Sequence, residues 1–332
     1  MQKMSTGGKQ SGMISKDSLA QATDLKFPQQ VQIKNRPAYQ IHLEARQNML
    51  VTFLGTAAAN AFPEAFCKCD HCEQARLHGG ASLRKRSALL VNDDLLIDLG
   101  PDIMAASQMH RCSLTNVRFC LQTHPHADHF DPSHFLSRSP GFGVVGAPEL
   151  NFYASAETIQ RAAMTFERDL ADYSLLSVEA EKLLNLAIHT IEPFVPFTFG
   201  SYRVIAVPAN HAPGMGAMLY AVEANGRSIF YGIDTAELFE QAWQSFIRFN
   251  LQFDQVILDH TYGLRESGSD HLSASQFVQH IARMRREGIL KPDGRAFATH
   301  IAHQGNPAHP DLVEYTRSQG YEVAYDGLIL EI

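Results

Sequence analysis

No stretch of this 332-residue sequence approaches the roughly 20 consecutive apolar residues that a helix needs to cross a bilayer. Residues 1–18 also lack the basic start and apolar core of a secretory signal, so we expect no membrane association and a cytoplasmic location. Basic side chains are few, because 28 Lys and Arg stand against 35 Asp and Glu and give a formal net charge of −7. This charge argues against a nucleic-acid partner.

Cysteine is scarce, and its number, five, is odd. Three of the five, Cys67, Cys69 and Cys72, lie too close together for an extracellular disulfide framework, which again favours a reducing cytoplasm. Histidine is abundant by contrast, with sixteen residues. Because histidine titrates near neutrality and binds metals, its abundance indicates a metalloprotein.

Residues 1–48 differ from the rest of the chain. They start rich in Gln, Lys, Ser and Gly, and their few apolar residues follow no sustained period, which predicts an N-terminal extension. A buried strand is predicted at residues 49–55, and no low-complexity linker follows it. Residues 49–332 are therefore predicted to form one domain.

Strand and helix patterns alternate through this domain. Strands are predicted at residues 87–91, 95–99, 117–123, 150–153, 202–207, 219–222, 228–231, 255–259 and 296–299. Helices are predicted at residues 155–169, with Ser155 as the cap, and at 238–246, 273–287 and 310–319. Mostly apolar strands mixed with helices predict an α/β (α+β) fold in which helices cover the sheets.

Four metal-capable side chains follow the strand predicted at residues 117–123, in the segment His124-Pro-His126-Ala-Asp128-His129. On a loop between a strand and a helix these side chains can converge on one point. Imidazole and carboxylate groups suit Zn²⁺, Mn²⁺ or Fe²⁺, and catalysis requires one coordination position left open for water. The segment predicts a catalytic metal site rather than a solvated histidine-rich loop.

The pattern His124-x-His126-x-Asp128-His129 resembles the signature of the metallo-β-lactamase superfamily. Its other motifs can be placed in order, each after a predicted strand, at Asp98, His211, Asp234 and His300. The resemblance implies a four-layer αββα sandwich over residues 49–332, with the site at one edge of its two sheets.

The resemblance also implies which residues hold two divalent metals, Zn²⁺ or Mn²⁺. The first metal would be held by His124, His126 and His211, the second by Asp128, His129 and His300, with Asp234 as the bridge between them. Asp98 would support the site by hydrogen bonding. Two such metals lower the pKa of a shared water from about 16 toward 7, which makes a metal-bound hydroxide available at neutral pH. The implied reaction is hydrolysis, with Asp128 and Asp234 among the catalytic residues.

A second metal site is predicted at the cysteine cluster. Thiolates at the spacing of Cys67, Cys69 and Cys72 suit a tetrahedral structural Zn²⁺, which needs a fourth ligand. His71 would strain to reach the same ion, whereas His303 could reach across from another loop. Cys112 and Cys120 lie among apolar residues and are predicted to be buried hydrophobic side chains.

The cysteine cluster narrows the resemblance. A strand ending Phe-Leu-Gly-Thr at 53–56, the cysteine loop, and Thr-His-Ile-Ala-His-Gln at 299–304 are similar to the phosphodiesterases of the carbon–phosphorus lyase pathway, which hydrolyse cyclic ribose phosphates. In that branch the second histidine of the last motif completes the zinc site, which favours His303. The pyrroloquinoline quinone biosynthesis protein B family has a similar loop and is the nearest alternative.

Further residues of interest lie near the predicted site. His271 matches the position at which these phosphodiesterases place a histidine over the substrate, where it would stabilise phosphoryl charge or protonate the leaving group. It could equally be a polar residue at a helix N-terminus. Asp259 is expected to support the site, and Asp270 to be a local cap. The aromatic residues of the long segment 130–200 form either a lid or partner surface or, as we favour, additional core.

The sequence thus predicts a binuclear metal-dependent hydrolase, a phosphodiesterase acting on a small cyclic or nucleotide-like phosphate ester. The alternatives are a metal protein without phosphodiesterase activity, a nuclease, or a lactonase or β-lactamase of the same fold. The basic run at residues 84–86 is too short to favour a nuclease. The oligomeric state is open, and a homodimer is one option.

Overall fold

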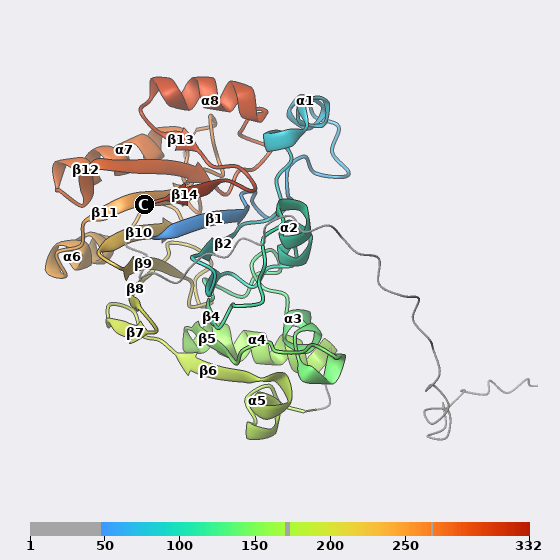
Figure 1. Ribbon diagram of the computed structural model, residues 1–332. Helices are drawn as coiled ribbons and strands as arrows, with labels where there is room; N and C mark the ends of the chain where they lie inside the picture. Colours follow the sequence, from blue (N-terminus) through green and yellow to red (C-terminus); the bar gives the residue numbers. More distant parts are fainter. Residues whose placement is uncertain (1–47, 170–172, 267) are drawn as a thin grey trace, which may run out of the picture. The chain divides into compact units, whose positions relative to one another are not determined.

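The computed structural model describes residues 48–169, 173–266 and 268–332, which belong to one compact unit (Figure 1). The N-terminal extension predicted for residues 1–48 lies almost wholly outside the described residues, so the division into extension and domain stays a prediction. Within the described ranges, no helix has both the length and the apolar character needed to cross a membrane.

The described chain contains two seven-stranded sheets, each part antiparallel and part parallel. The first sheet has the order β14 (Ile329–Glu331), β1 (Leu50–Gly55), β2 (Ala88–Val91), β3 (Leu95–Ile97), β4 (Phe119–Leu121), β5 (Leu150–Ala154) and β6 (Leu186–Thr190). The second has the order β13 (Glu322–Val323), β12 (Leu290–Thr299), β11 (Phe253–Asp259), β10 (Arg227–Gly232), β9 (Met218–Ala224), β8 (Tyr202–Pro208) and β7 (Phe197–Phe199).

The strands carry apolar side chains on both faces, because each sheet packs against the other sheet on one face and against helices on the other. In β3, Leu95 and Ile97 join the core between the two sheets, whereas Leu96 points to the opposite face and contacts the helices there. This alternation follows from the two-residue period of a strand. The inter-sheet core also contains the buried aromatic rings of Phe53 and Phe297, whose centroids lie 6.2 Å apart.

Helices cover the outer faces of both sheets (Figure 1). On the first sheet lie α2 (Ile103–His110), α3 (Ser133–Ser137), α4 (Ala156–Asp169) and α5 (Val178–Leu184). On the second lie α6 (Glu240–Arg248) and α7 (Ala274–Arg286), with α8 (His309–Ser318) beside β13. The remaining helical segments of the described ranges are α1 (Asp70–His78) and the short 3₁₀ helices η2 (Gly80–Ser82) and η3 (Pro140–Phe142). The predicted αββα sandwich is confirmed.

The long segment between residues 130 and 200 mostly extends the first sheet and its helices. Phe135, Phe152 and Phe166 are fully buried in the core beneath α3 and α4, which agrees with the interpretation as additional core. Phe142 of η3 is the exception, since 65% of its surface is exposed. The strands β6 and β7 within this segment were not predicted from the sequence.

Parallel pairing brings several strand ends to one edge of the sandwich. In the first sheet β3 pairs with β4 in parallel, and in the second β10, β11 and β12 run parallel to one another. Because Asp259 of β11 stands opposite Thr299 of β12, the residues that follow both strands emerge together. This edge is where the predicted metal ligands lie.

Candidate metal centre

The predicted ligands come from loops that follow four strands. His124, His126, Asp128 and His129 follow β4, His211 follows β8, Asp234 follows β10 and His300 follows β12. The structure brings all seven together in two groups that share Asp234, and a third group joins Asp259 and His271 to Asp234 and His300. In each group one ligand atom per residue lies within 4.8 Å of the others.

The first group contains His124, His126, His211 and Asp234. The Nδ1 atom of His126 lies 2.8 Å from Nε2 of His124 and 3.3 Å from Nε2 of His211. In a tetrahedral site with metal–nitrogen bonds of about 2.0–2.1 Å, neighbouring nitrogen atoms lie about 3.3 Å apart. The separation between His126 and His211 equals this value, and that between His126 and His124 is shorter, so the imidazoles converge as ligands of one ion do.

The second group contains Asp128, His129, Asp234 and His300. Nε2 of His129 lies 3.3 Å from Nε2 of His300 and 3.1 Å from Oδ2 of Asp128. The same Nε2 lies 3.3 Å from Oδ2 of Asp234, and that oxygen lies 3.1 Å from Nε2 of His124 in the first group. Asp234 thus stands between the two groups, in the position of a bridging carboxylate.

Two atoms at the centre lack partners. Oδ1 of Asp234 and Nδ1 of His211 are buried without a hydrogen bond, although they lie 3.2 Å apart. A buried polar atom without a partner is costly, and a carboxylate oxygen in that position is satisfied by a cation. The donor set and these unpaired atoms therefore fit divalent metals.

The ionisation of the groups also suits metal binding, because a metal needs neutral imidazole and ionised carboxylate. Burial lowers the pKa of His126 to about 4, so its ring is neutral at pH 7. Although burial opposes it, the nearby histidines keep the pKa of Asp128 and of Asp234 below the usual range. Burial also opposes charge on His129, but Asp128 and Asp98 outweigh it and raise the pKa of that imidazole. A bound cation would offset the same negative charge and so favour the neutral imidazole that a metal ligand requires.

Asp98 lies behind His129. Its Oδ2 is 2.7 Å from Nδ1 of His129, and its Oδ1 accepts hydrogen bonds from the backbone and hydroxyl of Thr123 and from the side-chain amide of Gln122. A carboxylate bonded to Nδ1 directs Nε2 of the ring toward the metal. Gln122 and Thr123 were not identified from the sequence, because nothing in the pattern of residues distinguishes them from the end of any other strand.

Asp259 and Thr261 hold the other side of the centre. The hydroxyl of Thr261 lies 2.7 Å from Nδ1 of His300, and Oδ2 of Asp259 lies 3.1 Å from Nδ1 of His271. Asp259 is fully buried and also accepts from the backbone N–H groups of Thr261 and Leu272. Thr261 was missed in the sequence, where its place two residues after Asp259 was the available signal.

His271 lies beside the second group rather than capping a helix. Its Nδ1 contacts Asp259 and lies 3.3 Å from Oδ1 of Asp234. Burial disfavours its charged form, but the carboxylates of Asp259 and Asp234 outweigh this and raise the pKa of His271 to about 9. Ser273 is the N-cap of α7, so the prediction that Asp270 is a local cap is wrong. Asp270 instead accepts a hydrogen bond from the hydroxyl of Tyr262.

Three residues of the centre have strained backbones. Asp98, Asp234 and His300 have φ angles of 70°, 52° and 57°, in the left-handed region that side-chain-bearing residues rarely adopt. Each follows a strand directly or by two residues. Such conformations cost about 1–3 kcal/mol each and gather at functional sites.

Five of the seven candidate ligands line a cavity of about 440 Å³, and the other two, His124 and His129, are buried behind them. Its lining comprises Ala58, Ala59, Asn60, Ala61, His126, Asp128, His211, Asp234, Thr261, Tyr262, Arg265, Asp270, His271, His300, Ala302 and Gln304. A cavity of this volume suits a small molecule.

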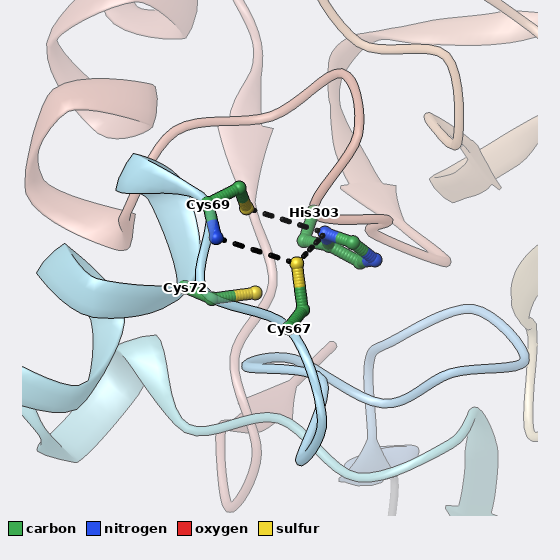
Figure 2. A group of neighbouring side chains, drawn as sticks. All are labelled: Cys67, Cys69, Cys72 and His303. Carbon is green, nitrogen blue, oxygen red and sulfur yellow. Dashed lines mark hydrogen bonds between the residues drawn. The ribbon is translucent and has the colours of Figure 1, made fainter.

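The cysteine cluster forms a separate group with His303, which shares no residue with the groups around Asp234 (Figure 2). Cys67 and Cys69 precede α1 and Cys72 lies in its first turn, and their sulfurs face the ring of His303 from the loop after β12. The Sγ atoms of Cys67 and Cys69 lie 3.6 and 3.5 Å from Nδ1 of His303. With bonds of about 2.3 Å to sulfur and about 2.05 Å to nitrogen, a tetrahedral zinc site sets that separation at about 3.6 Å. The geometry fits zinc.

The remaining predictions about cysteines and their neighbours can be placed as well. His71 donates from Nδ1 to the carbonyl of His303, 2.7 Å away, and so lies outside the group of four. Although burial raises it, hydrogen bonds from the Cys72 backbone and from His303 lower the pKa of Cys69 to about 6, toward the thiolate that binds zinc. Cys120 is fully buried as predicted, whereas Cys112 is only half-buried.

Comparison with known proteins extends these observations. A diphosphatase of the PhnP family has a similar structure, with a TM-score of 0.64, 20% sequence identity, and coverage of 86% of this chain and 97% of that one. Zn²⁺-bound PqqB from Methylobacterium extorquens has a TM-score of 0.59 and 20% identity, with coverage of 85% and 100%. The short form of human tRNase Z has a TM-score of 0.56 and 16% identity, with coverage of 85% and 98%. At these identities the likeness concerns the fold.

No curated protein matches the sequence. Residues 94–301, more than half of the chain, match the family described as the beta-lactamase superfamily domain. These residues run from the strand before Asp98 to the residue after His300, and so include all seven candidate ligands. The chain therefore belongs to the β-lactamase superfamily and has the metallo-β-lactamase fold.

Proposed function

We propose that this protein is a binuclear metal-dependent phosphodiesterase that cleaves a small cyclic or nucleotide-like phosphate ester. The observation that carries the proposal is the pair of ligand groups that share Asp234 beside a cavity of small-molecule size. Members of the fold family bind divalent metals, and the two groups support a centre with two ions here.

In this proposal His124, His126 and His211 hold one ion, Asp128, His129 and His300 hold the other, and Asp234 contacts both. When bound, such a pair of cations lowers the pKa of a water molecule toward neutrality and offsets negative charge on phosphoryl oxygens. The protein's own part is orientation, because Asp98 and Thr261 fix the rings of His129 and His300 from behind.

His271 supplies the proton in this proposal. Asp259 holds its Nδ1, and in the described part of the chain its Nε2 has no hydrogen-bond partner, while the ring lines the cavity. A protonated imidazole there donates a hydrogen bond to a phosphoryl oxygen or a proton to the departing alkoxide. Asp259 serves as the positioning residue that keeps the ring in place.

The size and charge of the cavity favour a small substrate over a nucleic acid. Its volume of about 440 Å³ matches one small molecule, and Arg265 is the one arginine or lysine in its described lining. A nucleic-acid groove needs a run of basic side chains along the backbone path. The cysteine cluster, with structural zinc, would fasten the loop before α1 to the loop that carries His300.

The first experiment combines metal analysis of the purified protein with hydrolysis of bis(p-nitrophenyl) phosphate, with and without added Mn²⁺ or Zn²⁺. We expect about three metals per chain and metal-dependent turnover. His126→Ala should abolish turnover, whereas the matched control His78→Ala, an exposed histidine on α1, should keep it. One tightly held zinc and no turnover with any metal would instead support a non-hydrolytic metal protein.

A second experiment separates the role of His271 from that of the metals. His271→Gln should slow the hydrolysis of esters with alkoxide leaving groups much more than that of p-nitrophenyl esters, because a good leaving group departs without a proton. Equal losses for both classes, with metal content unchanged, would remove His271 from the proton-transfer role.

A further inference from the structure

A fully buried asparagine, Asn306, joins two loops beside the metal centre. Its side-chain amide donates from Nδ2 to the backbone carbonyls of His260 and Thr261, at 3.0 and 3.2 Å. The same nitrogen donates to the carbonyl of Ala302 at 3.0 Å, in the loop that carries His300. Asn306 is 0% exposed, so these contacts are shielded from water. The amide therefore holds the loop after β11 against the loop after β12.

The other end of the amide is fixed by a buried histidine. Nδ1 of His260 lies 2.8 Å from Oδ1 of Asn306, and Nε2 of His260 lies 2.8 Å from the hydroxyl of Tyr321. Burial lowers the pKa of His260 to about 4, so its ring is neutral at pH 7 and has one N–H. Because an amide oxygen can only accept, Nδ1 of His260 donates to it and Nε2 accepts from Tyr321. Every polar atom of the side chains of His260 and Asn306 thus has a partner, and such a network fixes one conformation.

The backbone around the amide leaves little room for adjustment. Gly263 has a φ angle of 52°, and a Cβ added there would lie 2.5 Å from Oδ1 of Asn306. A Cβ added to Gly305 would lie 2.0 Å from the carbonyl oxygen of Tyr262. The two loops therefore pack backbone against backbone, and a shift of one changes the position of the other.

Both partners of one hydrogen bond at the centre depend on this contact. The hydroxyl of Thr261 lies 2.7 Å from Nδ1 of His300 and 3.0 Å from its carbonyl oxygen. Asn306 bonds to the backbone of Thr261 on one side and to that of Ala302, two residues after His300, on the other. We infer that Asn306 is a positioning residue, which holds Thr261 in place to orient His300 and thereby raises the affinity of the metal ion that His300 binds. This inference rests on the assignment of the ions in the proposed function, and it adds a residue that does not line the cavity.

Asn306→Ala tests the inference by competition with a chelator, which measures the affinity of each metal ion separately. The ion bound by His300 should bind about tenfold more weakly, the lower end of the effect of removing an orienting partner, and the affinity of the other ion should not change. The matched control is Asn92→Ala in the turn between β2 and β3. Asn92 donates to the hydroxyl of Tyr202 at 2.7 Å and accepts from the backbone of Leu50 at 3.1 Å. Its loss should lower the Tm by several degrees, as Asn306→Ala does, and change neither metal affinity.

The double variant Asn306→Ala with Thr261→Val tests the route of the effect. Thr261→Val already removes the hydroxyl that orients His300. The added loss of the Asn306 amide should therefore weaken binding of that ion by no more than about twofold further. Losses that multiply in the double variant would overturn the inference, because Asn306 would then act independently of Thr261.

Tyr321→Phe is a milder variant, since it removes only the hydroxyl that donates to His260. It should weaken binding of the same ion about two- to threefold, and it decides the question if Asn306→Ala does not fold. Equal weakening of both ions, or a lower Tm with both affinities unchanged, overturns the inference. The affinities are measured without substrate, so an absence of ester hydrolysis would overturn the phosphodiesterase and leave this inference in place.

Discussion

The substitution Thr261→Val tests how the second ligand group is held. Valine keeps the shape of threonine and removes only the hydroxyl, which accepts from Nδ1–H of His300 at 2.7 Å. The same oxygen lies 3.1 Å from Oδ2 of Asp259 and 3.0 Å from the carbonyl of His300, and Thr261 is 9% exposed. The valine variant leaves a buried N–H with only Asp259, 3.3 Å away, as a substitute acceptor.

The magnitude follows from these contacts. Losing one partner of a buried hydrogen bond costs about 1–3 kcal/mol of folding stability. Removing the group that orients a ligating histidine costs about 10–100-fold in metal affinity. We therefore expect the ion held by Asp128, His129 and His300 to bind about 10–100-fold more weakly, while the ion held by the other group is retained.

The assay is competition with a chelator, which measures the affinity of each of the two metal ions separately. The value of kcat/KM is then measured as a function of metal concentration. Excess metal should restore most of the activity, because the ligand His300 is still present. The matched control is Thr316→Val on α8, a buried threonine whose hydroxyl, among the described residues, bonds only to the carbonyl of Val313 at 3.3 Å. It should change stability slightly and neither binding step.

The reasoning is refuted if Thr261→Val binds both metals as the wild-type protein does. It is also refuted if the ion held by His124, His126 and His211 binds more weakly instead. The first result would mean that Asp259 alone orients His300. The second would mean that the assignment of residues to the two ions is reversed.

Three further predictions concern the scaffold. Cys69→Ser should release about one zinc and lower the Tm by several degrees while the metals of the cavity stay bound, and loss of those metals at unchanged Tm would contradict the division into two kinds of site. Gly55→Ala places a Cβ 1.9 Å from the carbonyl oxygen of Arg86 and should destabilise by about 1–3 kcal/mol or more in urea unfolding, whereas Gly141→Ala, whose Cβ meets only the Ser139 side chain at 3.6 Å, should not. Burial opposes ionisation of Asp102, but hydrogen bonds from Arg86 outweigh it and lower the pKa of that carboxyl, so its contribution is present above about pH 4 and is lost as the pH falls further. Arg86→Met should accordingly flatten the acid side of the stability–pH curve, and an unchanged slope would argue against the ion pair.

Much of the fold was predictable because its strands are short, apolar and buried on both faces. The sequence located β1, β8 and β11 within two residues of their bounds. It missed β6 and β7, because Leu186–Thr190 and Phe197–Phe199 are only partly buried and have weak apolar patterns. It also treated the cysteine segment as a loop, whereas Cys72 lies inside α1, whose buried face contains only Cys72 and Ala75.

The residues of the site also differ in how well the sequence predicts them. Metal-binding residues, such as His126 and His300, can be identified from their type and spacing. Thr261 cannot be identified in this way, because a threonine in a loop has no such signature. Its role depends on what lies opposite it in space, which is His300, 39 positions away in sequence.

The strained residues link the fold to the site. Asp98, Asp234 and His300 leave their strands with positive φ, and all three side chains contact other residues of the metal centre. Glycine would adopt such a turn more easily but would bring no ligand. Contacts that fix each turn offset the conformational strain. Examples are the hydrogen bonds between Asp98 and His129 and between Thr261 and His300. The carboxylates and imidazoles around Asp234 are brought together only in the folded protein. Metal binding there should therefore also stabilise the fold. We therefore expect the metal-free protein to unfold first at this edge, with amide exchange there faster than in the inter-sheet core.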